Sequence, residues 1–348
     1  MKAWVLHDVN DIRFEETEEP QLRENEVLVS IRAAGICGSD IPRIYKTGAH
    51  VHPLIPGHEF SGQVVTVGRK ADAKWLHKRV GIFPLIPCRN CIACQKQQFE
   101  LCRNYSYLGS RRNGGFAEYA AVPEWNLMEL PENVSYEEAA MLEPMAVAVH
   151  AMRRVQLHEN DTAVILGLGT IGMLLFLFLK DAGVERILAV GNKEFQRDTV
   201  IAFGLDEACY CDGKTQNISD WMMQRTGEAG ADVVFECVGK NETFSQAIDL
   251  ASPQGQVCLV GNPYSDMALE KAVYWKILRN QLGITGTWNS SFTHQADDDW
   301  HYVLERLMKK RISVNNLISQ ELELCDAKRG FLMMRDKSED YIKVMVKR

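Results

Sequence analysis

The sequence predicts an α/β protein with two parts, an all-β N-terminal region and a doubly wound parallel sheet. Three observations favour this fold class. Apolar and polar residues alternate over the first thirty residues, as they do in short strands with one buried face. Later, an apolar strand-like run leads into glycines spaced G-x-G-x-x-G and then into an apolar helix. Beyond that helix, β-like runs alternate with helical stretches, which is typical of parallel sheets.

Composition excludes several classes of partner. The 348 residues are enough for two domains of ordinary size, and the net charge of −7 argues against nucleic acid or an anionic membrane as the main partner. No basic leader with an apolar core opens the chain, and the most apolar run, 173–179, is too short to cross a bilayer. We therefore expect a soluble cytoplasmic protein whose ten cysteines are reduced.

Short alternating runs punctuated by proline and glycine define the all-β region, and such runs can form a compact barrel-like module with long loops. They lie at 2–6, 26–32, 61–67, 79–83 and 117–122. Near the end of the chain, 300–311 has helical spacing, with Leu304 and Leu307 on one face that we interpret as core. The last alternating run, 341–346, is expected to return to the N-terminal domain as a strand.

One segment, 35–62, contains the residue types that zinc prefers. Cys37, His58 and Glu59 offer a thiolate, an imidazole and a carboxylate. A catalytic zinc takes three protein ligands and keeps one position open, so these residues are candidate ligands. Ser39 follows the cysteine by two residues, where its hydroxyl could pass on the proton of a metal-bound alcohol. Taken alone, a cysteine and a histidine this far apart in the chain are more often ordinary core or loop residues. The motifs that follow in the chain strengthen the metal interpretation.

A second cluster has the spacing of a structural metal site. Cys88, Cys91 and Cys94 are separated by two residues each, and Cys102 follows eight positions later. Such gaps let four thiolates enclose one tetrahedral zinc with no open position. Unrelated buried cysteines are the alternative, which four cysteines within fifteen residues disfavour. A redox dithiol would leave two of the four unexplained.

Two adjacent arginines, Arg111 and Arg112, lie in a glycine-rich stretch at 108–119. Their guanidinium groups suit bidentate binding of an anion. A solvated basic turn before a strand explains the same residues equally well, so both interpretations stay open from these residues alone.

The pattern becomes helical at residue 135. Ser135, with Glu138 three residues later, predicts a capping box at the start of a helix over 136–142. We expect Glu143-Pro144 to break this helix and 145–155 to form a second one. An acid such as Glu143 among apolar neighbours is costly to bury unless it meets a cation, and a metal would supply one. The alternative is an exposed acid at a helix end.

The glycine motif predicts a dinucleotide site. Gly167 follows a buried apolar run and makes the turn. Gly169 lets the backbone approach a diphosphate, and Gly172 allows close packing of helix on strand. Thr170 and Ile171 open the helix, whose first amide groups hold the diphosphate. The further strands of the sheet are expected at 186–190, 232–237, 256–260 and 283–286.

Cofactor choice depends on the end of the second strand, Gly191-Asn192-Lys193, where an NAD site usually carries an acid for the ribose hydroxyls. Small, neutral and cationic residues leave room and charge for a 2′-phosphate instead, with Arg197 nearby. Glu194, the nearest acid, lies a few residues after the position where an NAD site carries its acid. We therefore favour NADP(H), and NAD remains the alternative.

Together these motifs resemble the zinc-containing medium-chain dehydrogenase/reductase family over essentially the full chain. The resemblance rests on Gly57-His58-Glu59, the four-cysteine cluster, Glu143-Pro144 and the glycine motif. Within the family, the stretches 35–50, 109–119 and 276–279 are similar to the branch that acts on galactitol 1-phosphate. The resemblance implies reversible, zinc-dependent oxidation of a secondary alcohol to a ketone with NAD or NADP.

The resemblance also implies a fold and a set of metal ligands. Residues 1–152 would form a GroES-like β-barrel catalytic domain, 153–288 a Rossmann NAD(P)-binding domain, and 289–348 would return to the catalytic domain. Each chain would hold one catalytic and one structural zinc and would assemble into a homodimer or homotetramer. The ligands of the catalytic zinc would be Cys37, His58 and Glu143, with Glu59 as an exchangeable fourth.

A sugar-alcohol phosphate is the substrate that the resemblance implies. The candidate residues for its phosphate are, in order, Arg111, Arg112, Arg43 and Lys46. Many members of the family have a histidine five residues after the zinc cysteine for proton relay, and this chain has Pro42 there. The relay would then run through Ser39, water or His50.

Other functions compete with this one. An enzyme of this fold could act on arabitol phosphate, on an unphosphorylated polyol or on L-threonine, with the arginines only structural. A non-catalytic nucleotide- or zinc-dependent binding protein would need neither an open metal position nor Ser39. A zinc module that binds nucleic acid is disfavoured by the acidic net charge.

Overall fold

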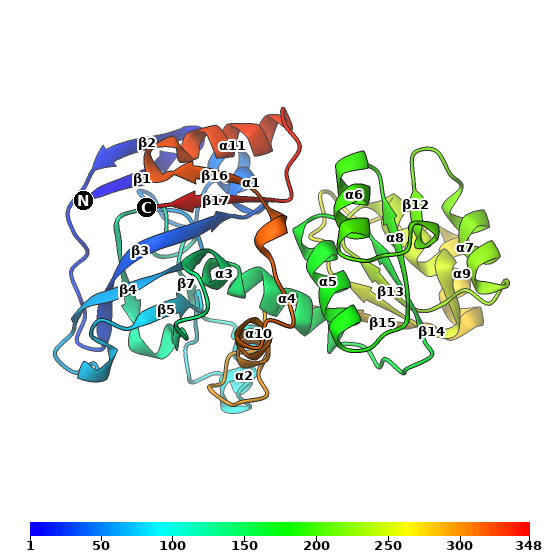
Figure 1. The fold of residues 1–348 in the computed structure, drawn as a ribbon, viewed down its shortest axis with the longest axis horizontal. Coiled ribbons are helices and arrows are strands. Elements are labelled where there is room, and N and C mark those ends of the chain that lie inside the picture. Colours follow the sequence, from blue (N-terminus) through cyan, green and yellow to red (C-terminus); the bar gives the residue numbers. More distant parts are fainter. The chain divides into compact units, whose positions relative to one another are not determined.

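The computed structural model describes residues 1–348, which fold into two compact units. The first unit contains Met1–Pro144 and Ser291–Arg348, and the second contains Met145–Ser290 (Figure 1). A mostly antiparallel sheet dominates the first unit and a six-stranded parallel sheet the second. The predicted α/β fold class is thus confirmed. None of the helices combines the length and the apolar character needed to cross a bilayer.

β3 (Glu26–Ile36) is the central strand of the first unit. It pairs antiparallel with β4 (Glu59–Val67), β8 (Tyr119–Pro123) and β17 (Lys343–Lys347). Because it has neighbours on several sides, nearly all of its residues are buried. The remaining strands of this sheet are β16 (Ile318–Glu323), β5 (Arg79–Ile82) and β9 (Leu127–Glu129). Two further pairs are β1 (Lys2–Asp8) with β2 (Asp11–Glu16), and β6 (Leu85–Ile86) with β7 (Ser106–Tyr107).

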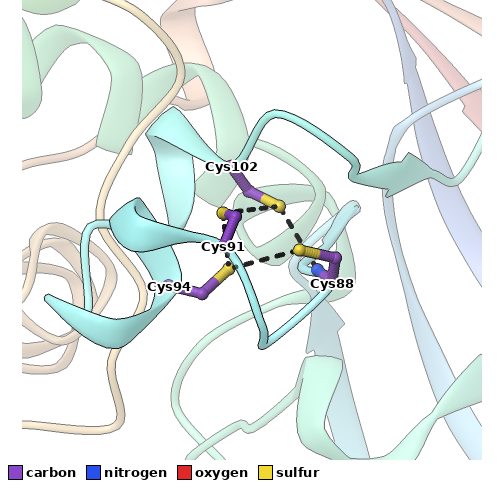
Figure 2. Close-up of side chains that lie close together, drawn as sticks. All are labelled: Cys88, Cys91, Cys94 and Cys102. Atoms are coloured by element: carbon purple, nitrogen blue, oxygen red, sulfur yellow. Dashed lines mark hydrogen bonds between the residues drawn. The ribbon is translucent and has the colours of Figure 1, made fainter.

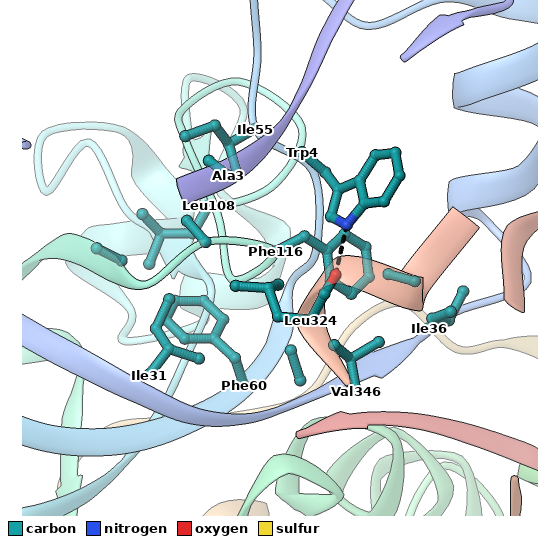
Figure 3. Packing of buried hydrophobic residues seen from close by; sticks show 14 of the residues in the cluster. Ala3, Trp4, Ile31, Ile36, Ile55, Phe60, Leu108, Phe116, Leu324 and Val346 are labelled. Carbon is teal, nitrogen blue, oxygen red and sulfur yellow. Dashed lines mark hydrogen bonds between the residues drawn. The ribbon is translucent and has the colours of Figure 1, made fainter. Parts of the chain in front are cut away.

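Hydrophobic side chains from both ends of the chain, among them Trp4, Leu324 and Val346, pack in the core of the first unit (Figure 3). The Trp4 and Phe331 rings meet edge to face with centroids 5.9 Å apart, and Phe116 lies 5.2 Å from Phe331. The Trp4 indole N–H donates to the buried Leu324 carbonyl at 2.6 Å. Residues 320 positions apart therefore share one core, and this core fixes the C-terminal segment onto the first strand.

The two helices on either side of Met141 test the predicted capping box and the predicted helix break at Glu143-Pro144. Ser135 and Glu138 form the expected capping box on α3 (Tyr136–Ala140). α4 (Leu142–Met152) begins before Glu143-Pro144, so the predicted break at these two residues was wrong. Proline is tolerated there because the first turn of a helix needs no hydrogen bond from its N–H. The other helices of the first unit are α1 (Asp40–Pro42), α2 (Ile92–Gln95), α10 (Asp299–Met308) and α11 (Ala327–Asp336).

The second unit is a doubly wound sheet with the strand order β12-β11-β10-β13-β14-β15. In chain order this is 3-2-1-4-5-6, the arrangement of Rossmann sheets. The order reverses between β10 and β13, and the carboxyl ends of the strands at such a reversal are where these sheets bind ligands. The strands are β10 (Thr162–Leu166), β11 (Arg186–Gly191), β12 (Tyr210–Asp212), β13 (Ala231–Glu236), β14 (Ala251–Leu259) and β15 (Gly283–Gly286). The helices are α5 (Thr170–Asp181), α6 (Glu194–Ala202), α7 (Ile218–Thr226), α8 (Asn241–Leu250) and α9 (Lys271–Asn280).

We expect Trp4→Phe to lower the midpoint of thermal unfolding in calorimetry. The phenyl ring keeps contact with Phe331 but leaves the buried Leu324 carbonyl without its donor, at a cost of about 1–3 kcal/mol. Tyr264→Phe is the matched control, because it also removes a polar group from an aromatic side chain but at a position that is 80% exposed. An unchanged midpoint for the Trp4 variant would contradict the importance of this bond.

Candidate active site

The ends of two paired strands bring three candidate ligands together. Cys37 directly follows β3, and Glu59 opens β4 directly after His58. Gly35 pairs with Glu59 in the antiparallel ladder, so both strand ends lie at the same edge of the sheet. The ligand atoms of Cys37, His58 and Glu59 all lie within 4.8 Å of one another. A compact set of sulfur, nitrogen and oxygen donors suits a zinc ion.

Asp40 supports this cluster, although the sequence analysis did not single it out. Its buried carboxylate lies 3.5 Å from Nδ1 of His58 and accepts the Cys37 amide at 3.0 Å. Arg43 donates to it at 2.5 Å. Burial opposes ionisation, but His58, Arg43 and the Cys37 amide together lower the pKa of Asp40. A carboxylate behind the imidazole is the usual support of a metal-binding histidine. Nδ1 of His58 is buried, faces Asp40 and has no hydrogen-bond partner.

Glu143 lies beside the three-residue cluster. Its Oε1 accepts the Tyr107 hydroxyl at 3.2 Å, and the Tyr107 ring lies 5.8 Å from the His58 ring. Burial raises the pKa of Glu143 to about 7, and the charge of Glu59 adds to the rise while His58 opposes it. Glu143 is thus a buried acid rather than an exposed one, and a neighbouring cation would favour its ionised form. No local motif marks Tyr107, which the sequence analysis missed.

Glu59 has a buried cationic partner near the end of the chain. The Lys343 ammonium donates to Oε2 of Glu59, and only 2% of each side chain is exposed. Lys343 opens β17, whose next residue, Val344, pairs with Ile36 of β3. The lysine therefore lies at the same edge of the sheet as Cys37. The sequence analysis assigned Lys343 no role, because nothing near it in the chain resembles a motif.

Ser39, His50 and Arg111 lie around the cluster. The Ser39 hydroxyl donates to Sγ of Cys37 at 3.4 Å. Desolvation and the charges of Arg111 and Arg43 lower the pKa of His50, which is exposed. The Arg111 guanidinium lies 4.6 Å from the centre of the Tyr105 ring, and its buried Nε has no hydrogen-bond partner.

The other cations predicted to bind the phosphate differ in their surroundings. Arg112 donates to Glu26 at 2.7 Å, and the side chain of Glu26 is almost completely buried. Arg43 is bonded to Asp40, and Lys46 is exposed. Among Arg43, Arg111 and Arg112, Arg111 is therefore the one for which the structure shows no carboxylate partner.

The four-cysteine cluster has the dimensions of a tetrahedral metal site (Figure 2). Its sulfur atoms lie 3.6 Å apart for Cys91 and Cys94, and 3.9 Å apart for Cys88 with Cys94 and for Cys91 with Cys102. Four sulfurs about 2.3 Å from a zinc ion would be about 3.8 Å from one another. Backbone N–H groups of Cys94 and Arg103 lower the pKa of Cys91 to about 6, which favours the thiolate that a metal needs. All four are free thiols, and their number and spacing fit one structural zinc.

The glycine motif has the geometry of a dinucleotide cradle. Gly167 adopts φ +97°, which L side chains rarely adopt. A Cβ at Gly172 would overlap the Gly167 carbonyl, so the helix can approach the strand only without a side chain. At Gly169 an added Cβ would meet no atom within 4 Å, which leaves this face open to a ligand. The first turn of α5, with Thr170 and Ile171, begins at this open space.

The residues expected at the ribose lie at the end of β11. Gly191 ends the strand, Asn192 is exposed, and Lys193 precedes α6 with its ammonium 5.2 Å from the Phe195 ring. No carboxylate lies within this tripeptide. Arg197, in contrast, is paired with Glu207 and lies 3.6 Å from Asp198.

Comparison with known proteins identifies the family of this chain. The model of the alcohol dehydrogenase GroES-like domain matches residues 23–132, and that of zinc-binding dehydrogenases matches residues 170–342. The galactitol 1-phosphate 5-dehydrogenase of Escherichia coli K12 is 33% identical over 321 residues, which cover 92% of each chain.

Solved structures agree with these matches. Galactitol-1-phosphate dehydrogenase from Escherichia coli superposes with a TM-score of 0.92 at 30% identity and full coverage of both chains. A putative zinc-binding dehydrogenase from Sinorhizobium meliloti 1021 bound to NADP gives 0.91 at 26%, covering 100% of this chain and 99% of the other. An alcohol dehydrogenase from E. coli CFT073 with NADH gives 0.90 at 25%, with the same coverage. The chain therefore belongs to the zinc-binding dehydrogenases with a GroES-like domain, and it is a zinc- and NAD(P)-dependent alcohol dehydrogenase.

Proposed function

We propose that this enzyme reversibly oxidises a secondary alcohol of a sugar-alcohol phosphate to a ketone, with galactitol 1-phosphate and tagatose 6-phosphate as the candidate pair. The observation that carries the proposal is the position of Arg111 relative to the metal-ligand cluster. Its guanidinium lies on Tyr105, which contacts Tyr107 with ring centroids 6.0 Å apart, and Tyr107 in turn contacts His58. A free cation two aromatic rings from the cluster suits a polyol with a phosphate at one end. The relative that acts on galactitol 1-phosphate supports the same choice.

Cys37, His58 and Glu143 would hold the catalytic zinc, with Glu59 beside them as an exchangeable fourth ligand. Zinc at such a site makes an alcohol hydroxyl more acidic and polarises a carbonyl. Ser39 accepts the proton that leaves the substrate hydroxyl and passes it to water or to His50. A nicotinamide cofactor held at the glycine motif would supply the two-electron acceptor for the hydride of the same carbon.

For the substrate phosphate we place Arg111 first, ahead of Arg112, Arg43 and Lys46. The buried Nε of Arg111 has no hydrogen-bond partner, which makes it a donor that an anion can satisfy. Arg112 instead neutralises Glu26 in the barrel, so we propose a structural role for it. Arg43 orients Asp40 and can face the phosphate only with its remaining donors.

Replacing Arg111 by Ala should raise KM for galactitol 1-phosphate about tenfold to a hundredfold, because a charge-assisted hydrogen bond is worth about 1.5–3 kcal/mol. KM for unphosphorylated galactitol or sorbitol should change little. The measurement is a steady-state panel of galactitol 1-phosphate, arabitol phosphate, sorbitol and L-threonine with NAD and with NADP.

Arg112→Ala is the matched control, since it removes the neighbouring guanidinium but should lower thermal stability rather than raise KM selectively. Equal KM changes for phosphorylated and unphosphorylated polyols in the Arg111 variant would refute the phosphate assignment. A wild type that prefers L-threonine or sorbitol over every phosphate would refute the substrate class itself.

For the cofactor we propose NADP(H). Gly191-Asn192-Lys193 offers no acid to hold two ribose hydroxyls, while Lys193 supplies a cation. The NADP-bound Sinorhizobium meliloti structure supports this choice, and the NADH-bound structure keeps NAD as the second candidate. Arg197 contributes less than the sequence suggested, because two acids already surround it. The same panel, run with both cofactors, decides the preference.

We further propose two zinc ions per chain, one in each cluster. Plasma emission spectrometry should find two per chain in the wild type and one in Cys37→Ser or Cys94→Ser. Cys37→Ser should lower kcat more than about a hundredfold, because even residues that only support a ligand change activity 10–100-fold. Cys94→Ser should chiefly lower the unfolding temperature. One zinc per chain in the wild type would favour a non-catalytic binding protein.

Finally, we propose that the chain associates with copies of itself as a homodimer or homotetramer. β15 is an open edge of the parallel sheet. Exposed apolar side chains lie on this strand and on the segments next to it in the chain. They are Ile284 on β15, Trp288 after it and Tyr274, Trp275 and Leu278 on α9, and are here called the edge residues. Exposed apolar residues beside an open sheet edge favour an interaction site, and a two-fold axis would let the same edge pair with itself.

Ile284→Lys should convert the oligomer to a monomer, because a lysine on an exposed edge strand opposes strand pairing. Light scattering after size exclusion measures the mass. Met308→Lys, on α10 in the other unit, places the same charge on a similarly exposed apolar residue and should leave the mass unchanged. A monomeric wild type would exclude the homo-oligomer.

A further inference from the structure

The proposed mechanism gives no role to the buried cation beside the metal-ligand cluster. Lys343 is a lysine with only 2% of its side chain exposed, and its ammonium bonds to Glu59. Lysine is almost never fully buried unless it is paired, because removing its charge from water is costly. A paired ammonium against a candidate metal ligand therefore needs an explanation beyond packing.

Three strands from distant parts of the chain are arranged to hold this pair. Gly35 of β3 faces Glu59 of β4 on one side and Met345 of β17 on the other. A Cβ on Gly35 would lie 2.7 Å from Cε of Lys343 and would overlap Oε2 of Glu59. The absence of a side chain at position 35 thus creates the space that the ion pair occupies.

The count of charges explains why a cation is needed there. With a metal bound, Cys37 as a thiolate and Glu59 and Glu143 as carboxylates would place three negative charges around it. A divalent ion would compensate two of them, and the ammonium of Lys343, which is bonded to Glu59, would compensate the third. Buried charges are tolerated when they are compensated in this way. Asp40 is neutralised separately by Arg43.

We propose that Lys343 is a positioning residue that keeps Glu59 beside the metal as a counter-ion and so leaves a ligand position free for the substrate oxygen. This inference rests on the proposed zinc-dependent function. The ligand atom of Glu59 already lies within 4.8 Å of those of Cys37 and His58. Without its lysine, the carboxylate would have the metal as the nearest cation, would ligate it, and would close the site to substrate.

Cobalt substitution tests this inference without relying on activity. Co²⁺ in place of zinc reports the number of ligands through its visible absorption bands. The wild type, Lys343→Met, Glu59→Gln and the double variant are compared as intact chains loaded with Co²⁺, and zinc release to a chelator is timed in parallel. The bands of the four-cysteine site should be the same in all four proteins and serve as an internal control.

We expect Lys343→Met to change the bands of the catalytic site toward a higher coordination number and to slow zinc release about tenfold, within the range by which supporting residues alter metal affinity. Glu59→Gln should keep the wild-type bands, because Glu59 is not a ligand while Lys343 holds it. In the double variant Lys343→Met should have no further effect, because the carboxylate through which the lysine acts is gone.

Three results would overturn the inference. Lys343→Met with wild-type bands and a lower unfolding temperature would make the lysine merely structural. An equal spectral change on Lys343→Met in the wild-type and the Glu59→Gln background would show that the lysine does not act through Glu59. Altered bands in Glu59→Gln alone would make Glu59 a resting ligand, and this result is decisive even where Lys343→Met does not fold. Failure of the wild type to bind Co²⁺ at Cys37 and His58 would instead refute the proposed function.

Discussion

The pairing of β3 with both β4 and β17 is the constraint on which the candidate active site depends. Through Gly35, one strand sets the position of Glu59 on one side and of the C-terminal strand on the other. Side chains alternate between the two faces of a sheet, so a slip of one residue would turn Glu59 away from Cys37. The aromatic contacts around Trp4 and Phe331 hold the C-terminal segment against the first strand.

Buried acids with separate partners characterise the site. Asp40 is bonded to Arg43, Glu59 to Lys343, and Glu143 to the Tyr107 hydroxyl. Each partner thus orients a buried acid. The three partners differ in charge. An arginine keeps its charge under all conditions, a lysine supplies a compact charge, and a neutral hydroxyl leaves the carboxylate dependent on a further cation. Glu143 is the acid whose pKa burial raises to about 7, as this difference predicts.

The two units use different chemistry for recognition. The first relies on side chains gathered from strands far apart in the chain. The second relies on backbone: the conformation of Gly167, the open space at Gly169 and the first turn of α5 form its cradle. Backbone amide groups at a helix start can hold a diphosphate without any charged side chain. The four-cysteine lobe is a third case, in which neighbouring residues alone define the geometry.

The sequence by itself determined the features that depend on neighbouring residues. The glycine motif, the cysteine spacing, the capping box at Ser135 and most strands follow from local spacing and periodicity, and the structure contains them. Cys37, His58 and Glu59 were also identified, because their residue types are those that zinc prefers.

Tertiary structure alone decided which charged groups face one another. Lys343 lies 284 positions from Glu59, Arg112 lies 86 from Glu26, and Tyr107 lies 36 from Glu143. No local pattern records such pairs, since they arise only when strand register and core packing bring distant segments together. For the same reason the sequence could not separate Arg111 from Arg112: adjacent residues of one type differ only in what the fold places beside each of them.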